Sequence, residues 1–566
     1  MHVALIALTL QLGFAAPPAR PPQGMAVIAA DSIRDLKRAR SAQASFEQAR
    51  RSSLPERGGS SGRCDVHLGR FCWWYDEYPV ELPPEPDAVT RRRAELLATL
   101  DALGDSHPGD EWLAGMRVHY RIDGRNAAGA DSIARNCSAT AWWCRALSGY
   151  ASHVLGQAAA AESAFADALA AMPDGERCAW RDISVLLPTN TRRYYEKLPC
   201  AERARVEERY WMLSRPQLGA EANEWRTEFY VRRAQARLAE RAVNPQPGSW
   251  GRDAAELVLR YGWPVGWSRA QQPLYLTQNV SVIGHDPVPS FNFAPVEELL
   301  DTTATANDDA WDMKLHTAES RFAPRLVSRV ASVAMQVARF RRGDSVLVVA
   351  AHAATHDSLR TDATALLAVA LADGTTRNAP AKGLVGTARL TIGSWPILAG
   401  VEVADTTTHT LARARVLMRT PERTGSLALS DLLLFRTSDG APESVDAALE
   451  RAVPGDTMSR SRPIGIYWET YGVAESGETF DVGVTVERID RSWVRGARQL
   501  LRLAAKDNPL RLRWNDARPA SPGEALNRAI SLDLTNQPAG KYRITVGLIR
   551  VDGRIVASTR EIELRD

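Results

Sequence analysis

Two different patterns of apolar positions divide this chain. Over about residues 88–213 the apolar side chains recur with helical periodicity. From about Pro287 onward they fall in short, often alternating runs that are separated by Gly, Asp and Pro. The first pattern predicts packed helices, and the second predicts β-strands arranged in sandwiches. The sequence therefore predicts a multidomain α + β protein, with an N-terminal helical domain and two C-terminal β-sandwiches.

The helical pattern contains two helix–turn–helix units at a spacing of 34 residues, so that Gly149 corresponds to Gly115 and Ala168 to Ala134. Small residues let paired helices approach closely, and Phe165 is expected to fill the space between them. The second unit resembles a tetratricopeptide repeat at Gly149, Gly156, Ala161, Phe165, Ala168 and Pro173. This resemblance implies a scaffold for a peptide or protein partner, or a structural brace, and flanking helices over 88–103 and 200–213 are expected to complete it.

The β pattern predicts two sandwiches, over residues 287–441 and 464–566, joined by a Pro-bounded linker over 442–463. On the opening strand of the second sandwich, Tyr467 and Tyr471 share one face and Trp468 lies on the other. One face is therefore expected to pack inside, and the other to meet the neighbouring domain. The predicted strands are 327–340, 345–351, 365–371, 386–392, 411–418, 430–435, 464–472, 479–489, 499–504, 530–534, 540–551 and 554–564.

Residues 201–286, between these two patterns, have a distinctive order. A charge-rich helical run leads through a Pro/Gly turn to Trp250, two spacer residues and Asp253. A predicted short apolar strand over 256–260 then ends at the sequence Tyr-Gly-Trp-Pro over 261–264. This order resembles the GWxTD-domain family of exported bacterial proteins, with Ser249 replacing the signature glycine and Arg252 its threonine. The resemblance implies export and a small α/β module, and it brings no established reaction.

The N-terminus and the cysteines both indicate export. Residues 1–16 are an apolar stretch that ends in small residues, as in a secretory signal peptide. Residues 17–62 are predicted to be a linker with one helix over about 32–51, followed by a disulfide-braced helical domain over 63–200. The six cysteines suit an oxidising compartment and permit fifteen connectivities. Loop closure favours three local pairs: Cys64–Cys72, Cys137–Cys144 and Cys178–Cys200.

Composition and charge argue against several classes of function. The 566 residues carry a net charge of +3, and the basic clusters lack interleaved aromatic residues, so a nucleic-acid partner is not expected. After removal of the signal, no apolar run approaches the ~18 residues that a membrane span requires. No CxxC spacing or phosphate-binding loop occurs, so neither a metal site nor a cofactor is predicted.

Four titratable residues are weak candidates for catalysis. Glu224 and Glu228 lie four positions apart on one predicted helix face, and Asp253 and His285 follow in the same module. Paired carboxylates could serve as general acid and base in a hydrolase of glycans or peptides. The alternative is that the glutamates pair with arginines of the same helix as surface support.

Residues of the GWxTD signature also have a structural explanation. Asp253 is placed to hydrogen-bond the backbone of the preceding turn, or to pair with an arginine. Gly262 marks a backbone position that requires unusual dihedral angles. Together with Tyr261 and Pro264, these residues are expected to hold the core of the module rather than to react.

The tryptophans carry the strongest signal for binding without catalysis. The chain has 16 tryptophans and only 11 phenylalanines, and two tryptophan doublets lie beside cysteines. Exposed tryptophan suits recognition of a sugar or a peptide, while the alternative is a two-layer core in the helical domain. The candidate binding residues are Trp73, Trp74, Trp142, Trp250, Trp263 and Trp267.

These features favour an exported, non-catalytic binding or assembly protein, periplasmic or extracellular. Its helical repeats and β-sandwiches are expected to contact a protein or glycan partner of the cell envelope. The alternative is an envelope or secreted hydrolase that uses the carboxylates of the GWxTD module. A purely structural envelope component is the third possibility. Convergence of Glu224, Glu228, Asp253 and His285 in one pocket would favour the hydrolase.

Overall fold

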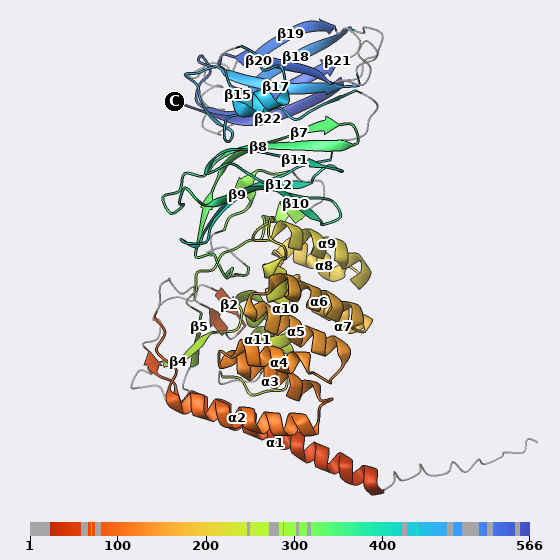
Figure 1. Cartoon of the computed structure of the whole chain (residues 1–566), viewed down its shortest axis with the longest axis vertical. Helices are drawn as coiled ribbons and strands as arrows, with labels where there is room; N and C mark the ends of the chain where they lie inside the picture. Colours follow the sequence, from red (N-terminus) through yellow and green to blue (C-terminus); the bar gives the residue numbers. More distant parts are fainter. Residues whose placement is uncertain are drawn as a thin grey trace, which may run out of the picture.

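The molecule is an elongated stack, with helices at its N-terminal end and β-sheets at its C-terminal end (Figure 1). The predicted multidomain α + β organisation is confirmed. The predicted signal peptide lies outside the residues that the structure describes. The computed structural model describes residues 23–57, 66–69, 71–73, 81–245, 250–270, 282–286, 288–300, 305–313, 319–420, 427–437, 440–472, 479–489, 509–517, 525–549 and 555–566.

The N-terminal half is a body of α-helices joined mostly by short turns. They are α1 (Gln23–Ser53), α2 (Asp87–Ser106), α3 (Glu111–Asp123), α4 (Ala127–Arg135), α5 (Ala141–Leu155), α6 (Ala158–Ala171), α7 (Asp174–Arg181), α8 (Thr189–Lys197), α9 (Cys200–Leu213), α10 (Glu224–Ala239) and α11 (Arg252–Tyr261). Local sequence sets their ends. The Asp110 carboxylate accepts a hydrogen bond from the Leu113 amide at the start of α3 (2.8 Å), and left-handed Gly156 ends α5.

The predicted helix hairpin is present as α5 and α6. A Cβ atom on Gly149 would lie 2.9 Å from the Phe165 ring, so the glycine permits the close contact of the two helices. Phe165 and Ala168 are fully buried at this contact. Small and large residues thus interlock as the spacing predicts.

The predicted strand over 256–260 is wrong, because these residues lie within helix α11. Its buried face carries Leu257, Val258 and Tyr261, which recur at helical spacing. Glu256 and Arg260 form an ion pair four residues apart, 2.6 Å between Oε1 and Nη2. The apolar run of three residues over 257–259 suits either element, and here tertiary packing selects the helix.

One large apolar core includes described side chains from every helix between α1 and α11. It joins Phe46 of α1, Trp143 of α5, Phe229 of α10 and Phe322 beyond α11. The predicted boundary at residue 200 therefore does not separate two cores. Residues 17–62 also contain more helix than predicted, since α1 begins at Gln23 and its C-terminal half belongs to this core.

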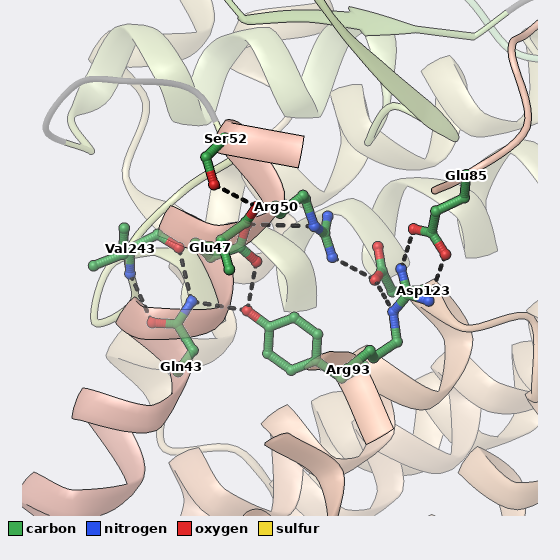
Figure 2. Close-up of polar contacts among 10 residues, drawn as sticks. Gln43, Glu47, Arg50, Ser52, Glu85, Arg93, Asp123 and Val243 are labelled. Atoms are coloured by element: carbon green, nitrogen blue, oxygen red, sulfur yellow. Dashed lines mark hydrogen bonds and ion pairs between the residues drawn. The ribbon is translucent and has the colours of Figure 1, made fainter. Parts of the chain in front are cut away.

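A buried polar network fastens α1 to the rest of the body (Figure 2). The Gln43 side-chain amide donates to the Tyr120 hydroxyl and to the Val243 carbonyl, both at 2.8 Å. Tyr120 in turn donates to Glu47 (2.8 Å). Farther along α1, Arg50 contacts the Asp123 carboxylate (2.5 Å). The network joins parts of the chain up to 200 residues apart, so α1 is an integral element.

Within the described residues, the β half contains four stacked sheets, and two small sheets lie beside the helices. The first sheet has the strand order β10 (Thr376–Pro380), β9 (Thr364–Ala370), β12 (Leu398–Asp405), β13 (Thr410–Leu417) and β6 (Arg329–Ser332), and the second has the order β11 (Val385–Ile392), β8 (Ser345–Ala353) and β7 (Ala334–Arg342). In the third sheet, β14 (Ala428–Leu429) and β15 (Leu433–Arg436) lie on one side of β17 (Ile464–Tyr471), and β20 (Leu526–Leu532) lies on the other. The fourth sheet has the order β16 (Thr457–Ser459), β22 (Ile555–Arg565), β21 (Gly540–Ile549), β18 (Thr479–Arg488) and β19 (Leu510–Ala517). The small sheets are β1 (Glu56–Arg57), β4 (Gly266–Ala270) and β5 (Val282–His285), and β2 (Val66–Leu68) with β3 (Phe71–Trp73).

Apolar layers fill every space between neighbouring sheets. In β8, Val348 faces the sheet of β9 and β12, while Val349 on the opposite face meets the sheet of β17. In β17, Tyr467 packs toward β7 and β8, and Trp468 packs toward β18 and β21. This confirms that the two faces of the β17 strand meet different layers. Strands covered on both faces explain the continuous apolar runs in this half of the sequence.

Two predicted boundaries in the β half are wrong. The strand β15 pairs with β17, so it belongs to the second sandwich and not to 287–441. The predicted linker over 442–463 contains a helix, α12 (Val445–Glu450), and the strand β16, which pairs with β22. Val445 and Leu449 of α12 are buried in the layer between the two sandwiches. The sandwiches therefore share an apolar interface instead of a loose tether.

Candidate functional site

Glu228 lies in a half-buried ion-paired arrangement on α10, with 20% of its side chain exposed. Its carboxylate accepts from Arg232 (2.7 Å) and lies 3.0 Å from the His153 imidazole of α5. Burial alone would raise the pKa of Glu228, but the Arg232 charge and the His153 contact outweigh it and lower the pKa to about 2. Glu228 is therefore a permanent carboxylate, which does not suit a general acid.

Arg232 connects Glu228 to the C-terminal end of α11. Its guanidinium donates to the carbonyls of Leu259 (3.1 Å) and Arg260 (2.8 Å), which have no partners within their own helix. A cation at this end also opposes the negative pole of the helix. Arg321 adds a bond to the Tyr261 carbonyl (3.1 Å), and these two arginines are named here the arginine clamp.

Gly262 ends α11 with a φ of 90°, which confirms the prediction of unusual dihedral angles. A Cβ atom there would also lie 3.2 Å from the Arg232 guanidinium. Tyr261 is fully buried against the hairpin of β2 and β3, and Pro264 packs over Gly284. These positions agree with a structural role for the signature residues.

Glu224 and Asp253 do not join Glu228 in one pocket. Glu224 lies in the first turn of α10, one turn before Glu228. Asp253 lies in the first turn of α11, about 10 Å along the helix axis from the carbonyls that Arg232 contacts. The Asp253 carboxylate packs against Gly69 of the β2–β3 turn, where a Cβ atom would overlap it at 1.9 Å.

His285 forms a pair that the sequence does not reveal. Its Nε2 atom lies 2.7 Å from the Ser268 hydroxyl, across the two strands β4 and β5. Both side chains are buried, with Ser268 fully so. The neighbouring Asp286 is bound by Arg321 at 2.6 Å. Only the pairing of β4 with β5 brings Ser268 to His285, so local patterns could not predict it.

The candidate tryptophans have different environments. Trp142 is 9% exposed and packs against Trp143 and Trp180, with the Arg237 guanidinium 4.8 Å from its ring centroid. The prediction of Trp142 as an exposed binding residue is therefore wrong, and the alternative of a two-layer core holds there. The Trp74 residue and the Trp73 side chain lie outside the described part of the chain.

The half-buried Trp263 and Trp267 form an edge-to-face pair, with ring centroids 6.3 Å apart. Trp263 makes a second such contact with His119 of α3, at 5.3 Å. Trp250 is half-buried before α11. Trp263 and Trp267 thus join the helical body to the small sheet of β4 and β5.

Two of the three predicted disulfides are confirmed. Cys137 is bonded to Cys144 and Cys178 to Cys200, with Cα–Cα distances of 5.5 Å and 5.9 Å. The first joins the ends of the α4–α5 connection, and the second joins α7 to the first residue of α9. The predicted Cys64–Cys72 bond lies outside the described side chains.

A cavity of about 330 Å³ opens between α6, α7, α9 and α10. Its apolar surface comes from Phe165, Leu169, Trp211 and Tyr230. Trp211 and Tyr230 are 4% and 6% exposed, and their indole N–H and hydroxyl make no hydrogen bond to another described residue. Because both side chains line the cavity, these groups are available to a bound molecule.

Charged side chains surround this apolar surface. Arg181 donates to Glu207 (2.7 Å), and Arg226 pairs with Glu162. Glu207 is buried, and it also accepts from Tyr195 (2.8 Å). Burial raises the pKa of Glu207 despite these two donors. The cavity was not predicted, because its walls come from four helices spread over about seventy residues.

The described residues hold no group of three or more His, Cys, Asp or Glu side chains that could bind a metal ion. Within the same part of the chain, no helix has both the length and the apolar character needed to cross a membrane.

The sequence matches no protein-family model and no curated protein. Among solved structures, a Bacteroides uniformis β-glucuronidase gives a TM-score of 0.16 at 10% identity, over 39% of this chain and 26% of that one. A bacterial ice-binding adhesin gives 0.13 at 10% identity, over 39% and 57%. Red sea bream transglutaminase gives 0.13 at 10% identity, over 41% and 31%. At these TM-scores the likeness supports no inference about fold or function.

Proposed function

We propose that this is an exported, non-catalytic binding or assembly protein of the cell envelope, which contacts a protein or glycan partner. The observation that carries the proposal is the cavity between α6, α7, α9 and α10, with its apolar surface and two unused donors at Trp211 and Tyr230. A concave, mainly apolar site with a few polar groups is the usual form of a binding site.

The environment of the candidate carboxylates supports a role without catalysis. Glu228 is held ionised by Arg232, and Asp253 packs near the opposite end of α11 from the arginine clamp. An acid–base pair needs two groups that share one substrate and differ in protonation. Glu228 contacts Arg232 at the C-terminal end of α11 and Asp253 lies in its first turn, so the two do not share one site, whereas both contribute to packing.

Export is supported by the apolar N-terminus and by the two disulfides in the helical body. The resemblances to GWxTD domains and tetratricopeptide repeats point the same way. The stacked sheets would then act as a rigid spacer that presents the helical body to its partner. Continuous apolar layers from α9 to β22 favour such rigidity.

The test is to block the cavity without disturbing the core. Ala166 is exposed on α6 and lines the cavity, so Ala166→Trp should fill it. Ala160→Trp, on an exposed part of α6 outside the cavity, is the matched control. Peptide and glycan arrays probed with the full-length protein should give ligands that bind the wild type and the control but not Ala166→Trp. Ligands unaffected by Ala166→Trp would contradict the assignment of the cavity.

The alternative is a hydrolase of glycans or peptides, and the specific observation in its favour is the Ser268–His285 pair at 2.7 Å. Turnover of cell-wall or peptide substrates that is lost in both Ser268→Ala and His285→Gln, with the folded structure retained, would establish it. We rank it second because Ser268 is fully buried, which favours a structural bond between two strands.

A further inference from the structure

We propose that the cavity between α6, α7, α9 and α10 binds a carboxylate that carries an apolar arm. The proposal rests on the proposed function, since it specifies the ligand of the same cavity. Two sources share this chemistry: the C-terminal residue of a peptide, and a free small carboxylic acid.

Unused hydrogen-bond donors dominate the polar part of the cavity. Arg181 and Arg226 each donate one side-chain N–H to a described carboxylate, as does Arg177 to Asp174, although a guanidinium has five. Trp211 and Tyr230 add one free donor each. A site rich in donors favours a ligand rich in acceptors, and a carboxylate offers about four acceptor positions.

Most of the acceptors in the cavity are already engaged. Both Glu207 oxygens accept, one from Tyr195 and one from Arg181, and Glu162 accepts from Arg226. Burial raises the pKa of Glu207, and the Arg181 charge that is bonded to this carboxylate opposes the shift. Glu208 is exposed on α9 and lies at the edge of the cavity. The groups left for a ligand are therefore mainly positive or donating.

The apolar part of the cavity favours an aliphatic or aromatic arm over a sugar. Phe165 and Tyr230 pack on each other with ring centroids 5.4 Å apart, and Trp211 packs on Phe229 at 5.3 Å. Because these rings contact other rings of the core, they present little flat surface on which a sugar could stack. A volume of about 330 Å³ suits one side chain with its carboxylate better than an oligosaccharide.

The test compares an acid with its amide on the full-length protein. The probes are hydrocinnamate, its primary amide, and an acetylated tripeptide ending in phenylalanine with a free or an amidated C-terminus. Binding is measured by calorimetry and by Trp fluorescence. We expect each acid to bind about tenfold more tightly than its amide, the effect of one charge-assisted hydrogen bond. A tripeptide acid that binds more tightly than hydrocinnamate identifies a peptide C-terminus, and equal affinities identify a free carboxylic acid.

Variants locate the site. Arg226→Met should weaken binding of the acid about tenfold and leave that of the amide almost unchanged, because Arg226 supplies charge to the carboxylate. Tyr230→Phe keeps the ring and removes only the hydroxyl, so it should weaken binding about fivefold without unfolding the body. Arg192→Met is the control, since Arg192 is a comparably exposed arginine outside the cavity.

Two outcomes would overturn the carboxylate proposal, and only the second would also contradict the assignment of the cavity as a binding site. If acid and amide bind equally but Ala166→Trp abolishes both, the carboxylate assignment fails and the cavity remains a binding site. If no probe binds, and array ligands of the wild type are unaffected by Ala166→Trp, both the carboxylate and the proposed function of the cavity fail.

Discussion

In the helical body many buried side chains are charged, whereas the layers between the sheets consist mainly of Val, Leu and Ala. Glu47, Arg50 and Arg232 are each at most 3% exposed in the helical body. Buried charges of the β half bridge neighbouring layers: Glu402 accepts from the Leu218 amide (2.7 Å) where the helices meet the first sheet, and Glu469 of β17 accepts from Arg342 of β7 (2.7 Å).

The difference shows how each half specifies its structure. Helices have no backbone bonds to one another, so the buried ion pairs select which segments pack together and in which orientation. Strands are already paired by their backbones, so mainly apolar layers stack the sheets, with a few ion pairs such as Arg342–Glu469 between them. A polar change should therefore be most damaging in the helical body, and a loss of apolar volume should be most damaging in the β stack.

The largest effect should follow removal of the charge of Arg232. Arg232→Met leaves Glu228 without its main partner and removes the side-chain donor of the Leu259 and Arg260 carbonyls, of which Arg260 keeps the Arg321 amide. We expect a loss of about 3–5 kcal/mol in the free energy of unfolding, measured by urea denaturation. The exposed pair of Arg92 with Glu95 is the control, and Arg92→Met should cost less than about 1 kcal/mol. Equal effects would show that the clamp is not a special support.

In the β stack, Leu433→Ala should lower the free energy of unfolding by about 2–4 kcal/mol. Leu433 is fully buried between the two sandwiches, beside Phe340 and Tyr467. The cavity left by the change should also expose 440–463 to proteases, because α12 packs on the same layer. Limited proteolysis followed by mass spectrometry checks this outcome. Cleavage of the wild-type protein in 440–463 before any other segment would show that the sandwiches are only tethered.

Sequence patterns predict the helices and strands better than they predict which of these elements pack or pair with one another. The α5–α6 hairpin, the Gly262 turn and two disulfides follow from spacing or residue type alone. The helix α11 was assigned as a strand because its short apolar run fits both periods. Strands β10, β12 and β19 were missed, since turn-rich or polar positions interrupt their pattern.

Contacts between distant segments could not be predicted from one sequence. Nothing near Ser268 indicates that it will face His285, and nothing near Arg232 indicates the α11 carbonyls. The placement of β15 failed for the same reason, because its pairing with β17 depends on the layer between the sandwiches. Local rules act over a few residues, whereas these contacts depend on packing of the whole chain.

Two ion-paired carboxylates of the helical body, Glu228 and Glu47, should give opposite dependences of the free energy of unfolding on pH. The pKa of Glu228 is lowered from 4.5 to about 2, so its stabilisation is complete above 4.5 and is lost as pH falls from 4.5 to about 2. The pKa of Glu47 is raised to about 7, because burial outweighs Arg50, so stability is greatest below 4.5 and declines as pH rises to about 7. Each effect should reach about 2–3 kcal/mol.

Urea unfolding at a series of pH values measures both effects. Glu228→Gln should remove the dependence of the free energy of unfolding on pH that the wild type shows below pH 4.5. Glu47→Gln should remove the dependence that the wild type shows between pH 4.5 and about 7. The same sign of change in both variants would show that the two carboxylates do not differ in the way their surroundings indicate.

The two confirmed disulfides should differ by about 1 kcal/mol in what each contributes to the free energy of unfolding. Their sequence separations are 7 and 22 residues, for which loop entropy gives about 2.5 kcal/mol for Cys137–Cys144 and about 3.4 kcal/mol for Cys178–Cys200. Replacing each pair by alanine and comparing urea midpoints measures the difference. Because both bonds lie in the helical body, neither change should alter protease resistance of 440–463. An effect there would show that the two halves unfold as one unit.

The smallest effect should come from Asp253, although it belongs to the signature that first marked this region. Asp253 lies in the first turn of α11, where a negative charge favours the helix by about 0.3–1 kcal/mol. Asp253→Asn should therefore cost less than about 1 kcal/mol in urea denaturation, well below Arg232→Met near the other end of the same helix. A loss as large as that of the clamp would reveal a buried partner for the carboxylate. Lost turnover with unchanged stability would instead make Asp253 catalytic, and would move the hydrolase ahead of the binding protein.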